Sequence, residues 1–218
     1  MAKRFLITRP KHDIITSYLH DFSSEIVRIA KETRDMHVTD LEGKMANRGN
    51  LNACLAKEHP GLVFLNGHGD RMRVAGHNNE IILDTTNINL SKGKIIYALS
   101  CDSLEGLGPI AVEQGAKAYI GYGARFMFVH DPTRVGSPRK DKNALPFRRA
   151  CAKLINSLVF GLPVSQALDL TKEEYMHSIR SYGTSEDDPY GDAPLIRFAL
   201  AWNLEFLSMH GDPAASFS

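Results

Sequence analysis

The sequence predicts an α/β fold with a mainly parallel central sheet and helices on both faces. Short runs rich in Val, Ile, Leu, Tyr and Phe occupy residues 62–67, 94–100 and 117–122, which is the length of buried strands. A helix-length segment separates the last two runs, as the crossover between parallel strands requires. The first two runs are followed by reactive side chains, His68 and Cys101, and ligands of parallel sheets bind beyond the carboxyl ends of the strands.

The other elements are assigned from apolar periodicity and from Pro and Gly. We expect a further strand at 4–8 and a short edge strand or hairpin at 81–84. Helices are expected at 12–31, 50–58, 106–114, 146–160 and 164–180, the last with Ser165 as its cap. Residues 26–29 could instead form a second strand, residues 36–49 are ambiguous, and residues 195–209 are apolar with a mixed period. The polar segments 130–143 and 181–194 are expected to be loops.

Length and composition bound the possible classes of protein. The 218 residues suit one domain, with a core at about 4–128 and a helical C-terminal part at about 146–213. A net charge of +1 gives no basic excess for direct nucleic-acid binding. No apolar run approaches the ~18 residues needed to span a bilayer, so no membrane association is expected.

The cysteines and the first residues of the chain suggest a reducing cellular compartment. Cys54, Cys101 and Cys151 are odd in number and widely spaced, which fits free thiols in a reducing environment better than a disulfide framework. The apolar run near the start is short and is broken by Arg9 and Pro10, so no signal peptide is recognised. We therefore expect a cytoplasmic protein.

An imidazole and a thiol at neighbouring strand ends could perform acyl transfer. A free thiol with a pKa near 8.5 is only about 3% ionised at pH 7, and a nearby imidazole can take its proton. Backbone amides beside Gly67 and Gly69 could stabilise an oxyanion. Two alternatives remain open: Cys101 could be a small buried apolar side chain, or His68, Asp70, His77 and His130 could bind a metal ion, although their spacing follows no regular ligand pattern.

Three segments carry a resemblance to a known family. They read Asn-Gly-His-Gly-Asp at 66–70, Ala-Leu-Ser-Cys-Asp-Ser at 98–103 and Gly-Ala-Lys-Ala-Tyr-Ile-Gly-Tyr at 115–122. Together they resemble the caspase-like (clan CD) cysteine peptidases, nearest to the gingipain-type and CHAT-type branches. Segments 146–168 and 207–213, the latter ending in Gly-Asp-Pro, are similar to later parts of the same family. The resemblance implies a caspase-like three-layer sandwich.

The resemblance also implies roles for individual residues. His68 would be the base or proton shuttle, Cys101 the nucleophile, and the amides of Gly69 and Cys101 the oxyanion donors. Several family members place an acidic residue directly before the cysteine, where this chain has Ser100. Asp70 and Asp102 are therefore candidates for binding a basic P1 side chain, or, alternatively, caps of the segments that begin there.

These residues lead to a functional hypothesis: a cysteine endopeptidase that acts on protein or peptide substrates without a metal or cofactor. We expect no pro-segment and little room for a sensor domain, and therefore control by a regulatory partner or by self-cleavage. The segment 134–142 is a candidate processing loop, expected to be extended and accessible, and its basic residues are Arg134, Arg139, Lys140 and Lys142. The alternatives are an inactive caspase-like scaffold and a metal-dependent hydrolase.

Overall fold

A computed structural model describes residues 2–182 and 191–217, and its centre is a six-stranded sheet. The strand order is β2-β1-β3-β7-β8-β9. The first five strands are parallel, and β9 pairs antiparallel with β8 at one edge. Their bounds are β1 Lys3–Arg9, β2 Met36–Glu42, β3 Leu62–Asn66, β7 Ile95–Leu99, β8 Ala118–Tyr122 and β9 Leu207–Gly211.

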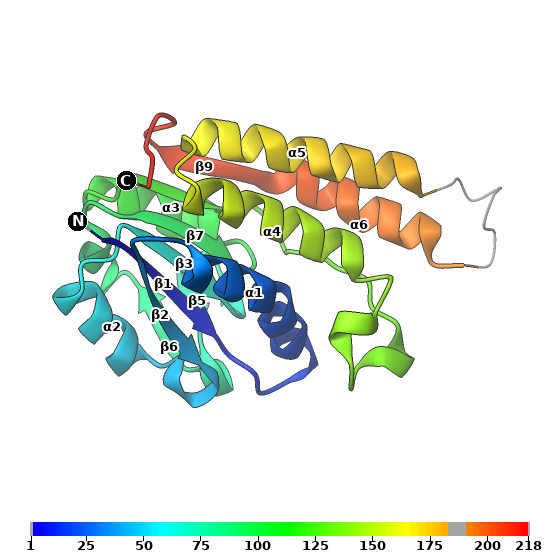
Figure 1. The fold of residues 1–218 in the computed structure, drawn as a ribbon, viewed down its shortest axis with the longest axis horizontal. Coiled ribbons are helices and arrows are strands. Elements are labelled where there is room, and N and C mark those ends of the chain that lie inside the picture. Colours follow the sequence, from blue (N-terminus) through cyan, green and yellow to red (C-terminus); the bar gives the residue numbers. More distant parts are fainter. Residues whose placement is uncertain (1, 183–190, 218) are drawn as a thin grey trace.

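Helices cover both faces of this sheet (Figure 1). One layer contains α1 (Ile14–Glu32), α4 (Leu145–Val159), α5 (Val164–Ser181) and α6 (Ala193–Phe206), and the other contains α2 (Arg48–Lys57) and α3 (Ser103–Glu113). Successive side chains of a strand point to opposite faces, so Phe64 joins the core under α1 and α4 while Val63 and Leu65 join the core under α2 and α3. The predicted α/β sandwich is confirmed. No helix within the described ranges is long and apolar enough to cross a membrane.

A small antiparallel sheet follows β3 and lies at the carboxyl edge of the central sheet. Its strands are β4 (Gly69–Asp70), β5 (Arg73–Ala75) and β6 (Ile81–Asp84), so the expected hairpin near 81–84 is present. Gly67 makes the turn from β3 with φ +152°, and a Cβ there would lie 2.0 Å from the carbonyl oxygen of Ala75. Only glycine allows this approach, which brings the chain after β3 back across the sheet edge.

The structure corrects several local predictions. Residues 26–29 belong to α1, because Ile26, Val27 and Ala30 continue the buried stripe of that helix. Ser165 is not the cap of α5: Pro163 occupies that position, and the amide of Ser165 donates to the carbonyl of Pro213. The ambiguous residues 36–49 begin with strand β2.

The C-terminal part is not wholly helical. The mixed period at 195–209 reflects α6 followed at once by β9, which returns to the central sheet beside β8. The strand therefore ties the region after residue 146 to the core at 4–128, and the assignment of 1–218 to one domain stays a prediction. Most of the expected loop at 181–194, namely 183–190, lies outside the described residues.

Candidate active site

His68 and Cys101 lie at the same edge of the central sheet. Strands β3 and β7 are adjacent and parallel, and each residue comes two positions after the end of its strand. Both side chains line one hollow of about 610 Å³. A Cβ on Gly69 would lie 2.8 Å from the Cβ of Ser100 and 3.1 Å from the carbonyl oxygen of Cys101. The absence of a side chain at Gly69 therefore lets the segment of His68 pack directly against that of Cys101.

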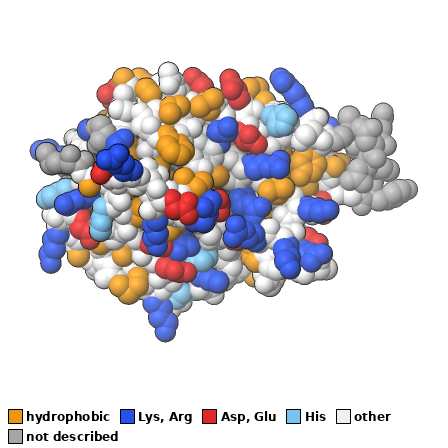
Figure 2. All heavy atoms as spheres, in the orientation of Figure 1, with side chains coloured by type: hydrophobic (Ala, Val, Ile, Leu, Met, Phe, Trp, Pro, Cys, Tyr) orange, Lys and Arg blue, Asp and Glu red, His pale blue; other side chains and the backbone are white. Residues whose placement is uncertain are grey.

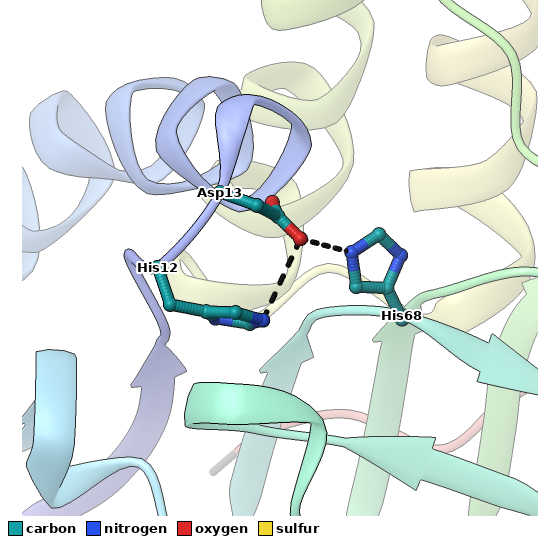
Figure 3. A group of neighbouring side chains, drawn as sticks. All are labelled: His12, Asp13 and His68. Carbon is teal, nitrogen blue, oxygen red and sulfur yellow. Dashed lines mark hydrogen bonds and ion pairs between the residues drawn. The ribbon is translucent and has the colours of Figure 1, made fainter.

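His68 is held by an aspartate from another part of the chain. Its Nε2 lies 2.7 Å from Oδ2 of Asp13, which precedes α1 and caps that helix (Figure 3). The other oxygen of Asp13 accepts from the backbone N–H of Thr16 at 2.7 Å and from its hydroxyl at 2.8 Å. The carboxylate thus has a fixed direction, and the imidazole is oriented through it.

Electrostatics favour the ionised form of Asp13. Burial alone would raise its pKa, but hydrogen bonds from Thr16 and His68 outweigh burial and hold the pKa below its ordinary value. An ionised carboxylate only accepts hydrogen bonds, so Nε2 of His68 carries the proton in this contact. In the neutral ring, Nδ1 is then the nitrogen with a free lone pair.

Cys101 lies in a turn between β7 and α3 and is partly buried. Burial raises the pKa of its thiol, and nearby Asp102 adds to this, whereas the backbone N–H of Phe126 and the charge of Arg125 act in the opposite direction. Asp102 has φ +57°, a left-handed conformation that Asp tolerates, and its amide donates to the carbonyl of Ala124 at 3.1 Å. The resting thiol is therefore protonated near neutral pH and requires a base to react.

The wall of the hollow is largely apolar. Ile15 and Leu19 contribute from α1, and Phe126, Met127 and Phe128 contribute from the segment after β8. The charged members are Asp70, Asp102 and Arg125. A volume of about 610 Å³ falls within the range of about 300–1,000 Å³ that is usual for ligand sites.

Asp70 and Asp102 differ in what they contact. Asp70 accepts from the backbone N–H of Met72 and forms an ion pair with Arg73 at 2.6 Å, so it closes the turn between β4 and β5. Asp102 occupies the position that caps α3, yet its carboxylate makes no capping hydrogen bond. The capping alternative therefore describes Asp70, whereas Asp102 lines the hollow and does not cap α3 through its side chain. The oxyanion roles of Gly69 and Cys101 stay a prediction, supported by the proximity of their backbones.

The metal site suggested by the sequence is not assembled. His68, Asp70, His77 and His130 do not form a cluster; the ring of His130 instead packs 5.2 Å from that of Tyr18. Within the described residues, the group with ligand-like proximity is His12, Asp13 and His68. Sequence reasoning missed Asp13, although an Asp three residues before Thr16 and ahead of an apolar helix is an N-cap signature. Since β1 neighbours β3, that cap lies beside His68.

The basic loop is accessible but not extended. It contains two short 3₁₀ turns, Pro132–Arg134 and Pro138–Lys140, so the expected extended form is wrong. The turns are anchored by buried Asp141, which accepts from the hydroxyl of Tyr18 at 2.6 Å and from the amide of Asp131 at 2.8 Å. Figure 2 shows Lys and Arg side chains gathered over this segment, and the four basic residues at its surface are Arg134, Arg139, Lys140 and Lys142.

Comparison with solved structures identifies the fold. No protein-family model and no curated protein matches the sequence. The chain is similar in structure to Saccharomyces cerevisiae separase in two complexes with securin, with TM-scores of 0.55 and 0.56 and 14% and 13% identity, over 97% of this chain. It is also similar to RgpB of Porphyromonas gingivalis in a complex of its pro- and mature domains, with a TM-score of 0.55 and 12% identity, over 99% of this chain.

These neighbours are caspase-like (clan CD) cysteine peptidases, so the caspase-like fold expected from the sequence is confirmed. The chain spans only 12% of the separase chain and 48% of the RgpB chain.

Proposed function

We propose that the chain is a caspase-like cysteine endopeptidase in which Cys101 is the nucleophile and His68 transfers the proton. The observation that carries this proposal is the placement of both side chains at adjacent strand ends around one hollow. The fixed contact between Asp13 and His68 adds support, since a general base needs an orienting partner. The fold is that of known cysteine peptidases, which is consistent with the same chemistry.

The proposed reaction follows the usual order of acyl transfer. Nδ1 of His68 takes the thiol proton, and the thiolate of Cys101 attacks the carbonyl carbon of the scissile bond. The amides of Gly69 and Cys101 stabilise the resulting oxyanion. The tetrahedral intermediate collapses as the leaving amine takes the proton from His68, and water then hydrolyses the thioester with His68 again as base.

Asp102 supports a preference for a basic residue at P1. Asp102 lines the hollow and its carboxylate makes no capping bond, so it is the candidate partner for a guanidinium or ammonium group. Asp70 contributes less because Arg73 already neutralises it. Arg125 in the same wall would oppose a basic side chain that approached it closely.

Profiling with a peptide library tests the activity and the preference together. We expect the wild-type protein to cleave after Arg or Lys, and Cys101→Ala to reduce cleavage to background while circular dichroism shows an unchanged fold. Full activity in Cys101→Ala would contradict the nucleophile assignment. A strict preference for acidic P1 residues would contradict the role of Asp102 and leave the dyad intact.

We propose that a partner protein or self-cleavage controls the enzyme. Two neighbours were solved with a securin and with a pro-domain, which is consistent with a regulatory partner here. The loop with Arg134, Arg139, Lys140 and Lys142 is exposed, but its 3₁₀ turns must open before a peptidase can bind it as an extended strand. Fragment mapping by mass spectrometry would show cuts after these residues that disappear in Cys101→Ala. An intact loop in an enzyme that cleaves other proteins would exclude self-processing there.

The raised pKa of Cys101 favours one alternative function, a caspase-like scaffold that binds a partner and cleaves nothing. Such a scaffold has no need of a reactive thiol. Its Cys101 would react with alkylating reagents no faster than Cys54 or Cys151. Turnover of any peptide that is lost in Cys101→Ala would exclude the scaffold.

A further inference from the structure

We propose that His12, Asp13 and His68 form a binding site for Zn²⁺ and that zinc at this site reversibly inhibits the enzyme. The ligand atoms are Nε2 of each histidine and Oδ2 of Asp13. The binding site stands on the geometry of these three residues alone. Only its inhibitory consequence rests on the proposed function.

The three side chains converge from two segments of the chain (Figure 3). Oδ2 of Asp13 lies 2.7 Å from Nε2 of His68 and 3.5 Å from Nε2 of His12, and the candidate ligand atoms all lie within 4.8 Å of one another. Zinc bonds of about 2.0–2.1 Å place tetrahedral ligands about 3.3–3.4 Å apart. Small side-chain rotations therefore suffice to close the three ligands around one ion.

Thr16 orients two of the three ligands. Its backbone N–H and hydroxyl hold one oxygen of Asp13 at 2.7 and 2.8 Å, which leaves Oδ2 directed at the histidines. The hydroxyl of Thr16 also lies 3.4 Å from Nδ1 of His12, so Nε2 is the nitrogen of His12 that faces the cluster. Such outer contacts, which fix the ring and direct one nitrogen at the metal, are typical of zinc sites.

Without a metal ion, Nε2 of His12 has no close hydrogen-bond partner among the described residues. Its side chain is only 10% exposed, yet Nε2 makes only long contacts, 3.3 Å to Oδ1 of Asn79 and 3.5 Å to Asp13. A metal ion would therefore displace only weak partners of a nearly buried nitrogen that otherwise lacks a strong one. The side chains of Asp13 and His68 are 36% and 38% exposed, which leaves a path for the ion to enter.

The chemistry of the donors selects the metal. Two imidazoles and one carboxylate are ordinary zinc ligands, and three protein ligands leave a fourth position for water. Mg²⁺ and Ca²⁺ prefer sites built from oxygen ligands and are not expected to bind.

The position of the ring proton explains why zinc inhibits. Zinc takes the lone pair of Nε2 in the neutral ring of His68, so the ring proton moves to Nδ1. No nitrogen of His68 then remains to accept the proton of Cys101.

Isothermal titration with Zn²⁺, and visible absorption with Co²⁺ as a zinc substitute, test the site directly. We expect one ion per chain in the wild type and an affinity at least about tenfold lower in His12→Gln, because even outer-shell changes cost about 10- to 100-fold. The matched control is His37→Gln, an exposed histidine on β2, which should bind as the wild type does. Equal affinity in wild type and a folded His12→Gln would overturn the site.

Cys101→Ala separates this site from zinc bound by the thiol. If His12, Asp13 and His68 are the ligands, Cys101→Ala keeps its zinc affinity, whereas loss of binding in that variant would place the ion on the thiol and overturn the ligand set. A Co²⁺ spectrum without sulfur-to-metal charge transfer agrees with the proposed donors.

Peptide cleavage measures the consequence. Zinc should inhibit the wild type and His37→Gln, a chelator should restore their activity, and the inhibition constant should rise at least about tenfold in His12→Gln relative to its own metal-free rate. Loss of activity on chelation would make zinc an activator and overturn the inhibition. Zinc binding that depends on His12, in a chain that cleaves no peptide, would retain the site and refute the proposed function instead.

Discussion

The two residues of the candidate dyad, His68 and Cys101, are fixed by different kinds of contact. His68 has a fixed charged partner, because Asp13 contacts its ring at 2.7 Å and is itself fixed by Thr16. For Cys101 the structure, over the residues it describes, gives no ion pair or hydrogen bond to a charged side chain: its thiol is partly buried, near the amide of Phe126, and burial raises its pKa. Under the proposed mechanism, the imidazole is thus oriented in the resting protein, whereas the thiol is not ionised in advance.

Under the proposed mechanism, this difference means that His68 must deprotonate the thiol of Cys101 before the thiol can react. A thiolate that forms only when His68 accepts its proton makes the base essential and its orientation valuable. A thiolate already formed would make the reaction far less sensitive to His68 and Asp13. Substitutions at His68, Asp13, Asp102 and Asp70, together with alkylation of Cys101, distinguish these cases.

Removing the base should have the largest effect. We expect His68→Ala to lower kcat by about 10²- to 10⁴-fold, the usual contribution of general acid–base catalysis. Steady-state kinetics on a peptide substrate measure it, with His130→Ala as a control histidine outside the hollow. A change of less than about tenfold would show that Cys101 does not depend on His68.

Removing the orienting partner should have an intermediate effect. Asp13→Asn keeps the shape but loses the charge, and a hydrogen bond to a charged group is worth about 1.5–3 kcal/mol, or about 10- to 150-fold in rate. We expect a lower kcat with little change in KM. Asp13→Glu should recover part of the activity if orientation is the cause. Wild-type kcat in Asp13→Asn would show that Asp13 serves only as the cap of α1 and does not assist catalysis.

Asp70 and Asp102 also differ in their partners: Asp70 forms an ion pair with Arg73, whereas the side chain of Asp102 makes no capping hydrogen bond. Asp102→Asn should lower kcat/KM for Arg and Lys at P1 by about tenfold relative to neutral P1 residues. Asp70→Asn should change that ratio less, since Arg73 already pairs with this carboxylate. The comparison uses one matched set of peptides that differ only at P1. Equal or reversed effects of the two substitutions would contradict the assignment of Asp102.

Alkylation rates examine the thiol itself. Because its pKa is raised above the ordinary value, the thiolate fraction and the rate with iodoacetamide should still increase as pH rises through 9. Cys101 should react fastest of the three cysteines. Burial raises the pKa of Cys54 to about 11 and that of Cys151, which is fully buried, to about 12. A rate for Cys101 that is constant from pH 6 to 8 would reveal a preformed thiolate and remove the contrast with His68.

Much of the fold could be predicted because its signals are local. The central strands β3, β7 and β8 are short, mostly apolar runs whose residues are buried on both faces. The strands at the two edges of the sheet were harder to predict. β2 is half-exposed and polar, and β9 follows α6 without a break, so neither shows a clear alternation of apolar and polar residues. The basic loop was expected to be extended because of its Pro and Gly content, and the contact of its Asp141 with the hydroxyl of Tyr18 is not visible in that composition.

Local patterns of residues are enough to predict the parallel sheet and the placement of His68 and Cys101 at one edge, because such patterns mark strand ends and parallel strands align their ends. Tertiary packing, in contrast, sets which carboxylate contacts the imidazole of His68, and the structure shows which carboxylate is already paired. Asp13 lies 55 positions from His68 and reaches it only because β1 pairs with β3, and Asp70 is taken by Arg73 while Asp102 is not. The contact between Asp13 and His68 depends on how separate elements pack, so no local pattern of residues encodes it, whereas the pair of Asp70 and Arg73 lies within one turn.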